Sequence, residues 1–384
     1  MSLPEPVRAE LDRVTHPVLV DVAALDQVRR RFDDEQAAAL AGYLSAAQSP
    51  NTLRAYRADW VSWAAWCLQE NRQALPADPV DVAVYLAVAA ESRKPDGSPA
   101  FSPSTLERKA AAIAAVHAAG GLPSPTRSDV VRLTLRGIRR TRRDQPRRKR
   151  PVLLDTLADL LAERPPPGWP TGVARRRDAL LLLVGFAGAL RRSELAALRL
   201  EDVTVDVDAR TQEPLLLVEL GVTKTDQTGV HRQRVVLPRG ARRPTCPVCA
   251  FADWVDVLTA ADPRSLLEDE PDGEPTHRCH SYRPQAHQGP LFPAVSRYGR
   301  IAAKPMSDKA VSDLVKRYAL KAGLDPALFG GHSLRAGFAT QAALGGASDR
   351  EIMRQGRWTN PRTVHRYIRT ANPLEDNAVT RLGL

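Results

Sequence analysis

Two short stretches in the second half of the sequence carry side chains that suit the binding of a phosphate. The run Gly-Ala-Leu-Arg-Arg-Ser-Glu-Leu spaces Arg191 and Glu194 so that they share one helix face. The run Gly-Gly-His-Ser-Leu-Arg places His332 and Arg335 at the start of a helix, where free backbone N–H groups also favour an anion. The first pair on its own is more typical of a surface ion pair, whereas the second predicts an anion site.

A third stretch adds an indole and a phenol. Trp358 lies in the run Gly-Arg-Trp-Thr-Asn-Pro, and Tyr367 stands nine residues further on, in a helix that Asn360 can cap and Pro361 can open. A tyrosine can attack a phosphate and keep it covalently, so that the bond energy is available for rejoining. Because a phenol titrates only at about pH 10 in water, such a tyrosine needs activation by neighbouring groups.

Apolar periodicity predicts helices for most of the chain. From Ser49 onward, Leu53, Tyr56, Trp60 and Trp63 recur at helical spacing behind a Ser-Pro-Asn-Thr start. Further helices are expected at 79–90, 104–119, 128–140, 152–163, 175–190, 193–198, 247–259, 307–322, 333–344, 348–356 and 361–370. Two alternating runs, 214–220 and 230–237, flank a polar turn that contains Lys224 and predict a hairpin. We therefore expect a mainly α fold with a small antiparallel β-sheet.

A basic segment divides the sequence in two. Eight of the twelve residues from 139 to 150 are Arg or Lys, which is typical of an exposed linker. We predict an N-terminal arm at 1–35, a helical domain at 36–140, a linker at 141–150 and a second domain at 151–384. These cations, and Arg54 and Arg57 of the helix that starts after Ser49, either contact a phosphate backbone or are simply solvated at the surface. The cations expected to contact a phosphate backbone are Arg54, Arg57, Arg139, Arg140, Arg142, Arg143, Arg147, Arg148, Lys149 and Arg150.

Composition narrows the class of partner. The 384 residues include 55 Lys and Arg against 44 Asp and Glu, a net charge of +11, which favours a polyanion. A hydrophobic fraction of 43% excludes wholesale disorder. The longest apolar stretch, 179–190, is too short to span a bilayer. The start of the sequence has acids and prolines where a signal peptide needs a basic, then apolar, segment, so we expect a cytoplasmic protein with no membrane partner.

The order of Arg, Lys on a hairpin, His-x-x-Arg, Trp and Tyr resembles the tyrosine recombinase (phage integrase) family, and the Gly-Arg-Trp-Thr-Asn stretch resembles its Cre-like branch, in which Trp replaces the commoner His. The likeness covers most of the chain. It implies a C-shaped, two-domain DNA clamp, with 36–140 as the helical core-binding domain and 151–384 as the catalytic domain.

The resemblance also implies a role for each residue. Tyr367 would be the nucleophile that forms a 3′-phosphotyrosine. Arg191 and Arg335 would neutralise the charge that develops on the phosphate, because guanidinium groups offer planar, permanently charged forks to its oxygens. Lys224 would give a proton to the leaving 5′ oxygen, and His332 would assist proton transfer at the tyrosine.

Two further roles follow from the same resemblance. Trp358 would donate its indole N–H to a phosphate oxygen. Glu194 would brace Arg191 and its neighbours. Neither role requires a metal or another cofactor, and we expect none, because the cations and the indole supply the charge stabilisation that a metal would otherwise give.

The partners expected from the resemblance are double-stranded DNA at a specific recombination site and three further copies of the chain. Four protomers would act on two sites through a Holliday junction, with a monomer or weak dimer off DNA and a nucleoid-associated location in a bacterial, phage or plasmid setting. A type IB topoisomerase and a DNA-binding regulator with an inactive catalytic domain are the alternatives. The target sequence and the biological task do not follow from the sequence.

Cysteine and histidine residues gather between 246 and 287. Cys246 and Cys249 form a Cys-x-x-Cys pair, and His277, Cys279, His280 and His287 follow in a polar insertion, a composition that also suits zinc. Because Cys-Pro-Val before an apolar helix is also an ordinary helix entry, we predict no metal site here. We expect no disulfide either, since four cysteines in a chain of 384 residues do not make a disulfide framework.

Overall fold

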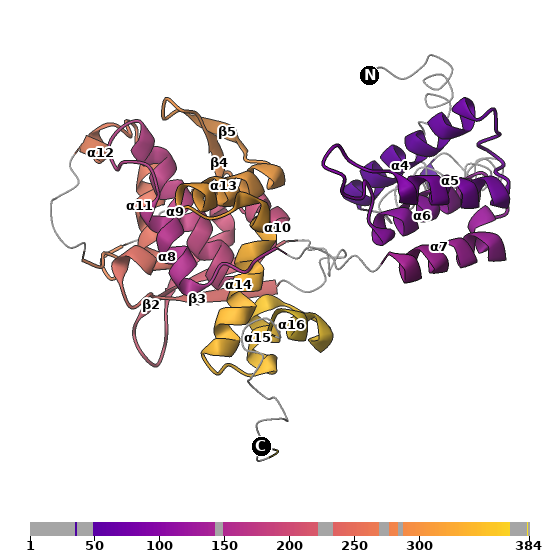
Figure 1. Ribbon diagram of the computed structural model, residues 1–384. Helices are drawn as coiled ribbons and strands as arrows, with labels where there is room; N and C mark the ends of the chain where they lie inside the picture. The colour runs from indigo at the N-terminus through magenta and orange to yellow at the C-terminus, as the bar shows by residue number, and fades with distance from the viewer. Residues whose placement is uncertain are drawn as a thin grey trace. The chain divides into compact units, whose positions relative to one another are not determined.

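The computed structural model describes residues 35–36, 49–142, 149–221, 233–268, 276–282, 287–368 and 382. The chain divides into two compact units, Met1–Arg147 and Arg148–Leu384 (Figure 1). Within the described residues, no helix has the length and apolar character that a membrane crossing requires.

The first unit is helical throughout its described part. Its helices are α4 (Pro50–Gln69), α5 (Pro79–Glu91), α6 (Pro103–Ala119), a short 3₁₀ turn (Pro125–Arg127) and α7 (Asp129–Thr141). The α4, α5 and α6 helices each begin with a proline behind a side-chain cap, supplied by Ser49, Asp78 and Ser102. The apolar stripe of α4 is buried as predicted, with Trp60 and Trp63 at 2% and 0% exposure.

The second unit surrounds a buried central helix. This helix, α9 (Thr171–Ala187), is apolar around most of its circumference and packs against α11 (Pro247–Thr259) and α14 (Gly331–Leu344). The remaining helices are α8 (Leu154–Ala162), α10 (Arg192–Ala197), α12 (Ser265–Glu268), α13 (Asp308–Lys321), α15 (Asp349–Gly356) and α16 (Pro361–Ile368). Figure 1 shows α14, α15 and α16 stacked together at one end of this unit.

A three-stranded antiparallel sheet of β1 (Val203–Val207), β2 (Pro214–Leu220) and β3 (Gln233–Pro238) packs on the helices. Leu216 pairs with Leu237 and Val218 with Val203, so the alternate residues of β2 face the core. The predicted hairpin is therefore confirmed in its described strands, while its turn, with Lys224, lies outside the described residues. A second pair of strands, β4 (Pro293–Val295) and β5 (Ile301–Pro305), was not expected, because both are short and β5 is mostly exposed.

Candidate active site

The turn between α9 and α10 positions Arg191 and Glu194. Ala189 adopts a left-handed backbone conformation (φ 47°), which reverses the chain after α9. Arg191 then caps α10, and Glu194 accepts hydrogen bonds from the Arg191 backbone N–H at 2.8 Å and from its guanidinium. Glu194 is buried, so this is an internal pair and not the surface pair that the local sequence favours.

The first turns of α14 bring Arg335 to the same place. A side chain at Gly331 would put a Cβ only 2.8 Å from the Arg192 Cβ, so glycine allows α14 to approach α10. Arg335 is 3% exposed, donates from Nη1 to the carbonyl of Ala189, and lies 4.2 Å below the Trp358 ring. Its Nη2 is buried and has no hydrogen-bond partner in the described part of the chain.

A third guanidinium, Arg357, joins the site, and the sequence did not identify it. Arg357 follows α15 in a left-handed conformation (φ 56°) that turns its side chain inward. Its Nη2 donates to Glu194 Oε2 at 2.9 Å, and its Nη1 donates to the Gly188 carbonyl at 3.2 Å. The only sequence signal was its place next to Trp358, since a non-glycine residue in this conformation cannot be read from a pattern.

The charges of this cluster are unbalanced. Burial and the nearby Arg191 and Arg357 cations lower the pKa of Arg335 to about 9. Burial also lowers the pKa of Arg357. Burial by itself would raise the pKa of Glu194, but Arg357 and the Arg191 donors outweigh it and the pKa is lowered. One carboxylate thus faces three guanidinium groups, which leaves an excess of positive charge for an anion.

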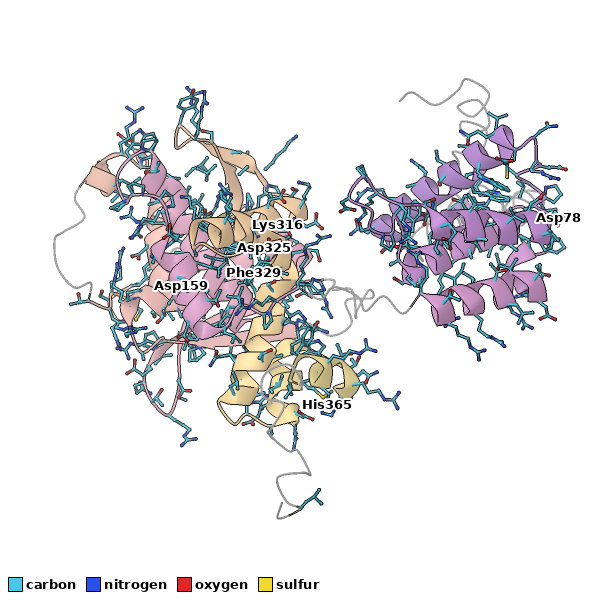
Figure 2. The ribbon with its side chains drawn as sticks, viewed as in Figure 1. Asp78, Asp159, Lys316, Asp325, Phe329 and His365 are labelled. Atoms are coloured by element: carbon cyan, nitrogen blue, oxygen red, sulfur yellow. The ribbon has the colours of Figure 1, made fainter. Side chains whose placement is uncertain are left out.

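Trp358 and Tyr367 close the other side of the cluster. Their ring centroids lie 5.9 Å apart with the planes inclined by 49°. The Thr340 hydroxyl donates to the Tyr367 carbonyl at 3.4 Å, which ties the end of α16 to α14. His365, labelled in Figure 2, hydrogen bonds Asp349 and ties α16 to α15. The phenol of half-buried Tyr367 is therefore carried on a helix that is anchored to both neighbours.

Five of the predicted site residues thus come together: Arg191, Glu194, Arg335, Trp358 and Tyr367. His332 is exposed in the first turn of α14, three residues before Arg335. Lys224 lies outside the described residues.

The cations expected to contact DNA fall into three groups. Arg54, Arg57 and Arg140 are exposed. Arg54 and three others make contacts within their own unit: Arg54 donates to Asn51 Oδ1 at 2.8 Å, Arg139 pairs with Glu107 at 3.0 Å, Arg142 donates to the Phe101 carbonyl at 3.0 Å, and Lys149 donates to the Ala327 carbonyl. Arg150 is exposed, and Arg143, Arg147 and Arg148 lie outside the described residues.

Replacing Glu194 with Gln is expected to destabilise the second unit by about 3–5 kcal/mol, because the guanidinium groups of Arg191 and Arg357 lose the carboxylate with which both of them pair. The pKa of Glu194 is lowered in the folded protein, so its contribution to stability is present at neutral pH and is lost as pH falls below the usual carboxyl range. Urea unfolding as a function of pH measures both effects. The exposed Glu163→Gln serves as the matched control; an equal loss in both variants would contradict the bracing role.

Replacing Gly356 with Ala is expected to displace Trp358, because the new Cβ would lie 1.8 Å from the indole Cζ3. Such overpacking typically costs about 1–3 kcal/mol. Indole fluorescence, thermal unfolding and DNA cleavage should all change. Gly345→Ala is the control, since its Cβ would meet only carbonyl oxygens at 3.5 Å; an unshifted indole in the Gly356 variant would contradict the close contact.

Comparison with known proteins gives a consistent result. The model of the phage integrase family matches residues 276–373. An integrase/recombinase xerD homolog of Selenomonas ruminantium is 33% identical over 345 residues, which cover 88% of this chain and 87% of the relative. The recombinase cre of Escherichia phage P1 is 28% identical over 377 residues, which cover 95% of each chain.

Solved structures share the fold at lower identity. XerH site-specific recombinase, bound to a palindromic difH substrate after cleavage, is 14% identical, with a TM-score of 0.51 over 94% of this chain and 89% of that one. The Tn1549 transposon integrase in complex with transposon right end DNA is 17% identical, with a TM-score of 0.51 over 95% of this chain and all of that one (100%). The predicted mainly α fold with small antiparallel sheets is confirmed.

Proposed function

We propose that Tyr367 is the nucleophile of this chain, which belongs to the phage integrase family of tyrosine recombinases and therefore cleaves and rejoins DNA. The phenolic oxygen attacks the scissile phosphate, the bond to the 5′ oxygen breaks, and a 3′-phosphotyrosine forms. The phenol gives up its proton and the leaving oxygen gains one. A later attack by a 5′ hydroxyl on the phosphotyrosine reverses these changes and joins the strands.

One observation carries this proposal: the buried Nη2 of Arg335 has no hydrogen-bond partner among the described residues, and it lies beside a second cation and the indole. A buried guanidinium N–H without a partner is costly, and a phosphate oxygen would satisfy it. Arg191 and Arg335 neutralise the non-bridging oxygens of the pentacoordinate transition state. Arg357 and Glu194 hold the pair in place, so that little reorganisation is needed when charge develops.

We assign the proton transfers to two further residues. Lys224 serves as the acid for the leaving 5′ oxygen, and His332 assists at the tyrosine. Trp358 contributes an N–H donor to the phosphate. The exposure of His332 in the first turn of α14 leaves its ring accessible to a bound strand.

The partner proposed for this chemistry is duplex DNA at a specific site, held by the helical unit and the catalytic unit as a clamp. The net charge of +11 and the exposed Arg54, Arg57 and Arg140 support a phosphate contact. Two structural relatives were solved with DNA substrates, which supports the same partner class. Four protomers on two sites, exchanging strands through a Holliday junction, complete the proposal, with action in the cytoplasm where such DNA lies.

A nicked suicide substrate tests the proposal. The target DNA sequence is first identified by selecting the DNA fragments that the protein binds, starting with the DNA that flanks its coding sequence. Loss of the short cleaved strand prevents rejoining, so the wild-type chain should accumulate as a covalent adduct whose peptide maps to Tyr367. Binding without adduct would indicate an inactive regulator, and plasmid relaxation without exchange between two sites would indicate a topoisomerase.

A further inference from the structure

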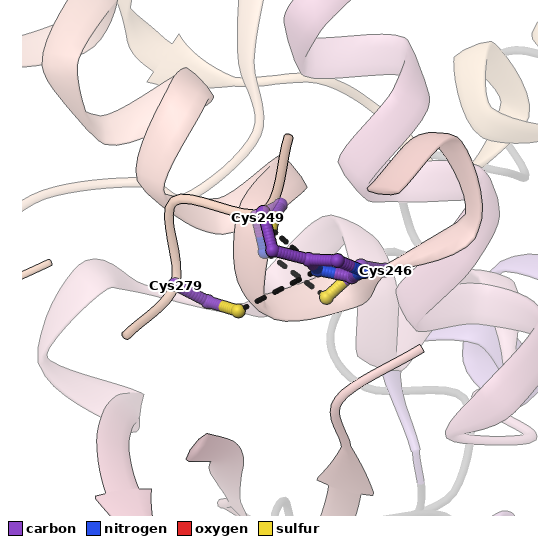
Figure 3. Close-up of side chains that lie close together, drawn as sticks. Cys246, Cys249 and Cys279 are labelled. Carbon is purple, nitrogen blue, oxygen red and sulfur yellow. Dashed lines mark hydrogen bonds between the residues drawn. The ribbon is translucent and has the colours of Figure 1, made fainter. Parts of the chain in front are cut away.

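Three cysteines and one histidine converge at the start of α11, away from the arginine cluster. Cys246 is the N-cap of this helix and Cys249 lies in its first turn, and the segment 276–282 of the insertion brings His277 and Cys279 close to them. Figure 3 shows the three cysteines together. The Sγ atoms and a ring nitrogen all lie within 4.8 Å of one another. Two pairs of residues, 28 to 33 positions apart in the sequence, thus direct four donor atoms at one point.

The spacing of these donors fits a tetrahedral zinc ion. With Zn–S bonds of about 2.3 Å and Zn–N bonds of about 2.0 Å, the edges of the tetrahedron measure roughly 3.8 Å between sulfurs and roughly 3.5 Å from sulfur to nitrogen. The Nδ1 of His277 lies 3.4 Å from Cys249 Sγ and 3.7 Å from Cys279 Sγ. These separations suit ligands of a common ion.

Neighbouring groups hold the four candidate ligand atoms in orientations that suit metal binding. The Nε2 of His277 faces the Ala241 carbonyl at 3.4 Å, which leaves Nδ1 as the nitrogen that points into the cluster. The Cys249 backbone N–H is directed at Cys246 Sγ at 3.5 Å. Gly240 packs on the backbone of Cys246 so closely that a Cβ would lie 2.7 Å from its Cα, which fixes the first cysteine.

The burial of the three cysteines beside a histidine is unusual for cysteines that serve only as apolar core residues. Cys246, Cys249 and Cys279 are each at most 2% exposed, and none forms a disulfide. Buried cysteines are usually isolated among apolar side chains, where no charge is needed. Here the insertion brings a histidine, itself half-buried, among the three cysteines. A Cys₃His set that closes on all four sides is the pattern of a structural zinc site.

We propose that Cys246, Cys249, His277 and Cys279 bind a structural zinc ion that fastens the insertion to the start of α11. This proposal differs from the expectation of no metal, which rested on the Cys-Pro-Val helix entry and on the polar character of the insertion. Because α11 packs on the central helix α9, the ion stabilises the unit that holds the arginine cluster, without taking part in the cleavage chemistry. The site is independent of the identity of the nucleophile.

Elemental analysis of the full-length chain, purified without chelator or metal-affinity tag, tests the proposal. We expect stoichiometric zinc, replaceable by Co(II) with the visible absorption of a tetrahedral thiolate complex. Cys279→Ala and His277→Ala should lose the metal. The matched variants His280→Ala and His287→Ala, in the same insertion but outside the cluster, should retain it, and circular dichroism establishes that each variant is folded.

A chelator provides a second measurement that does not depend on variants. Removing zinc from the wild-type chain should lower its thermal midpoint, and adding zinc back should restore it, because zinc binds only the folded site. The Cys279→Ala chain should not respond to either treatment. A wild-type chain that contains no zinc after growth in zinc-supplemented medium, or that contains a disulfide between these cysteines, would overturn the proposal.

Discussion

Tyr367→Phe is expected to abolish the covalent protein–DNA adduct while leaving DNA binding intact. The substitution removes a single oxygen, and the ring contact with Trp358 and the carbonyl bond from Thr340 do not depend on it. Loss of a covalent nucleophile typically lowers the chemical step on the order of 10⁴-fold or more. Denaturing gels with a suicide substrate measure the adduct, and gel shifts on the uncleaved duplex measure binding.

Tyr298→Phe is the control for this result. Tyr298 is 60% exposed and is therefore accessible to a DNA strand, but it lies outside the arginine cluster, so its variant should cleave like the wild type. Tyr318 is a weaker competitor, because its hydroxyl is buried and donates to Asp178 at 2.6 Å. An adduct formed by the Tyr367 variant would show that the nucleophile is elsewhere.

Helix positions followed from the sequence where capping residues and apolar spacing agreed. The expected bounds of 247–259 match α11, and those of 104–119 and 348–356 differ from α6 and α15 by one residue at the start. The sequence predicted that α9 begins at 175, whereas the helix begins at Thr171, directly after the proline-rich loop. The burial of Val173 in the core favours this earlier start. Capping residues and apolar spacing therefore predicted which segments are helical, but not always where each helix begins and ends.

The geometry of the site could not be predicted in full, because it depends on contacts between residues that are far apart in the sequence. Arg335 and Arg191 were identified by their motifs, but the burial of Arg335 against the Ala189 carbonyl depends on the approach of α14 to α10, which no local pattern encodes. Arg357 was missed because its inward direction depends on a left-handed backbone at a non-glycine residue. The convergence of Cys246, Cys249, His277 and Cys279 could not be predicted for a similar reason, since the return of His277 and Cys279 to α11 depends on the tertiary fold.

Arg335→Gln is expected to separate activity from stability. Loss of one preorganised donor to a developing charge costs about 2.7–4 kcal/mol of transition-state stabilisation, or about 100- to 1,000-fold in cleavage rate. The free energy of unfolding at pH 7 should stay the same or rise. Burial together with Arg191 and Arg357 lowers the pKa of Arg335 to about 9, so its charge opposes folding below that pH.

Arg177→Gln provides the contrast, because Arg177 is also buried, at 5% exposure, but its guanidinium is paired. Its Nε donates to Asp178 Oδ1 at 2.8 Å and its Nη1 to the Pro293 carbonyl at 3.1 Å. Removing it leaves a buried carboxylate without its cation and should cost about 3–5 kcal/mol of stability, while the folded fraction still cleaves. Urea unfolding and single-turnover cleavage distinguish the two variants. If Arg335→Gln instead lost stability as Arg177→Gln does, and cleavage followed only the folded fraction, the charge of Arg335 would serve the fold and not a phosphate.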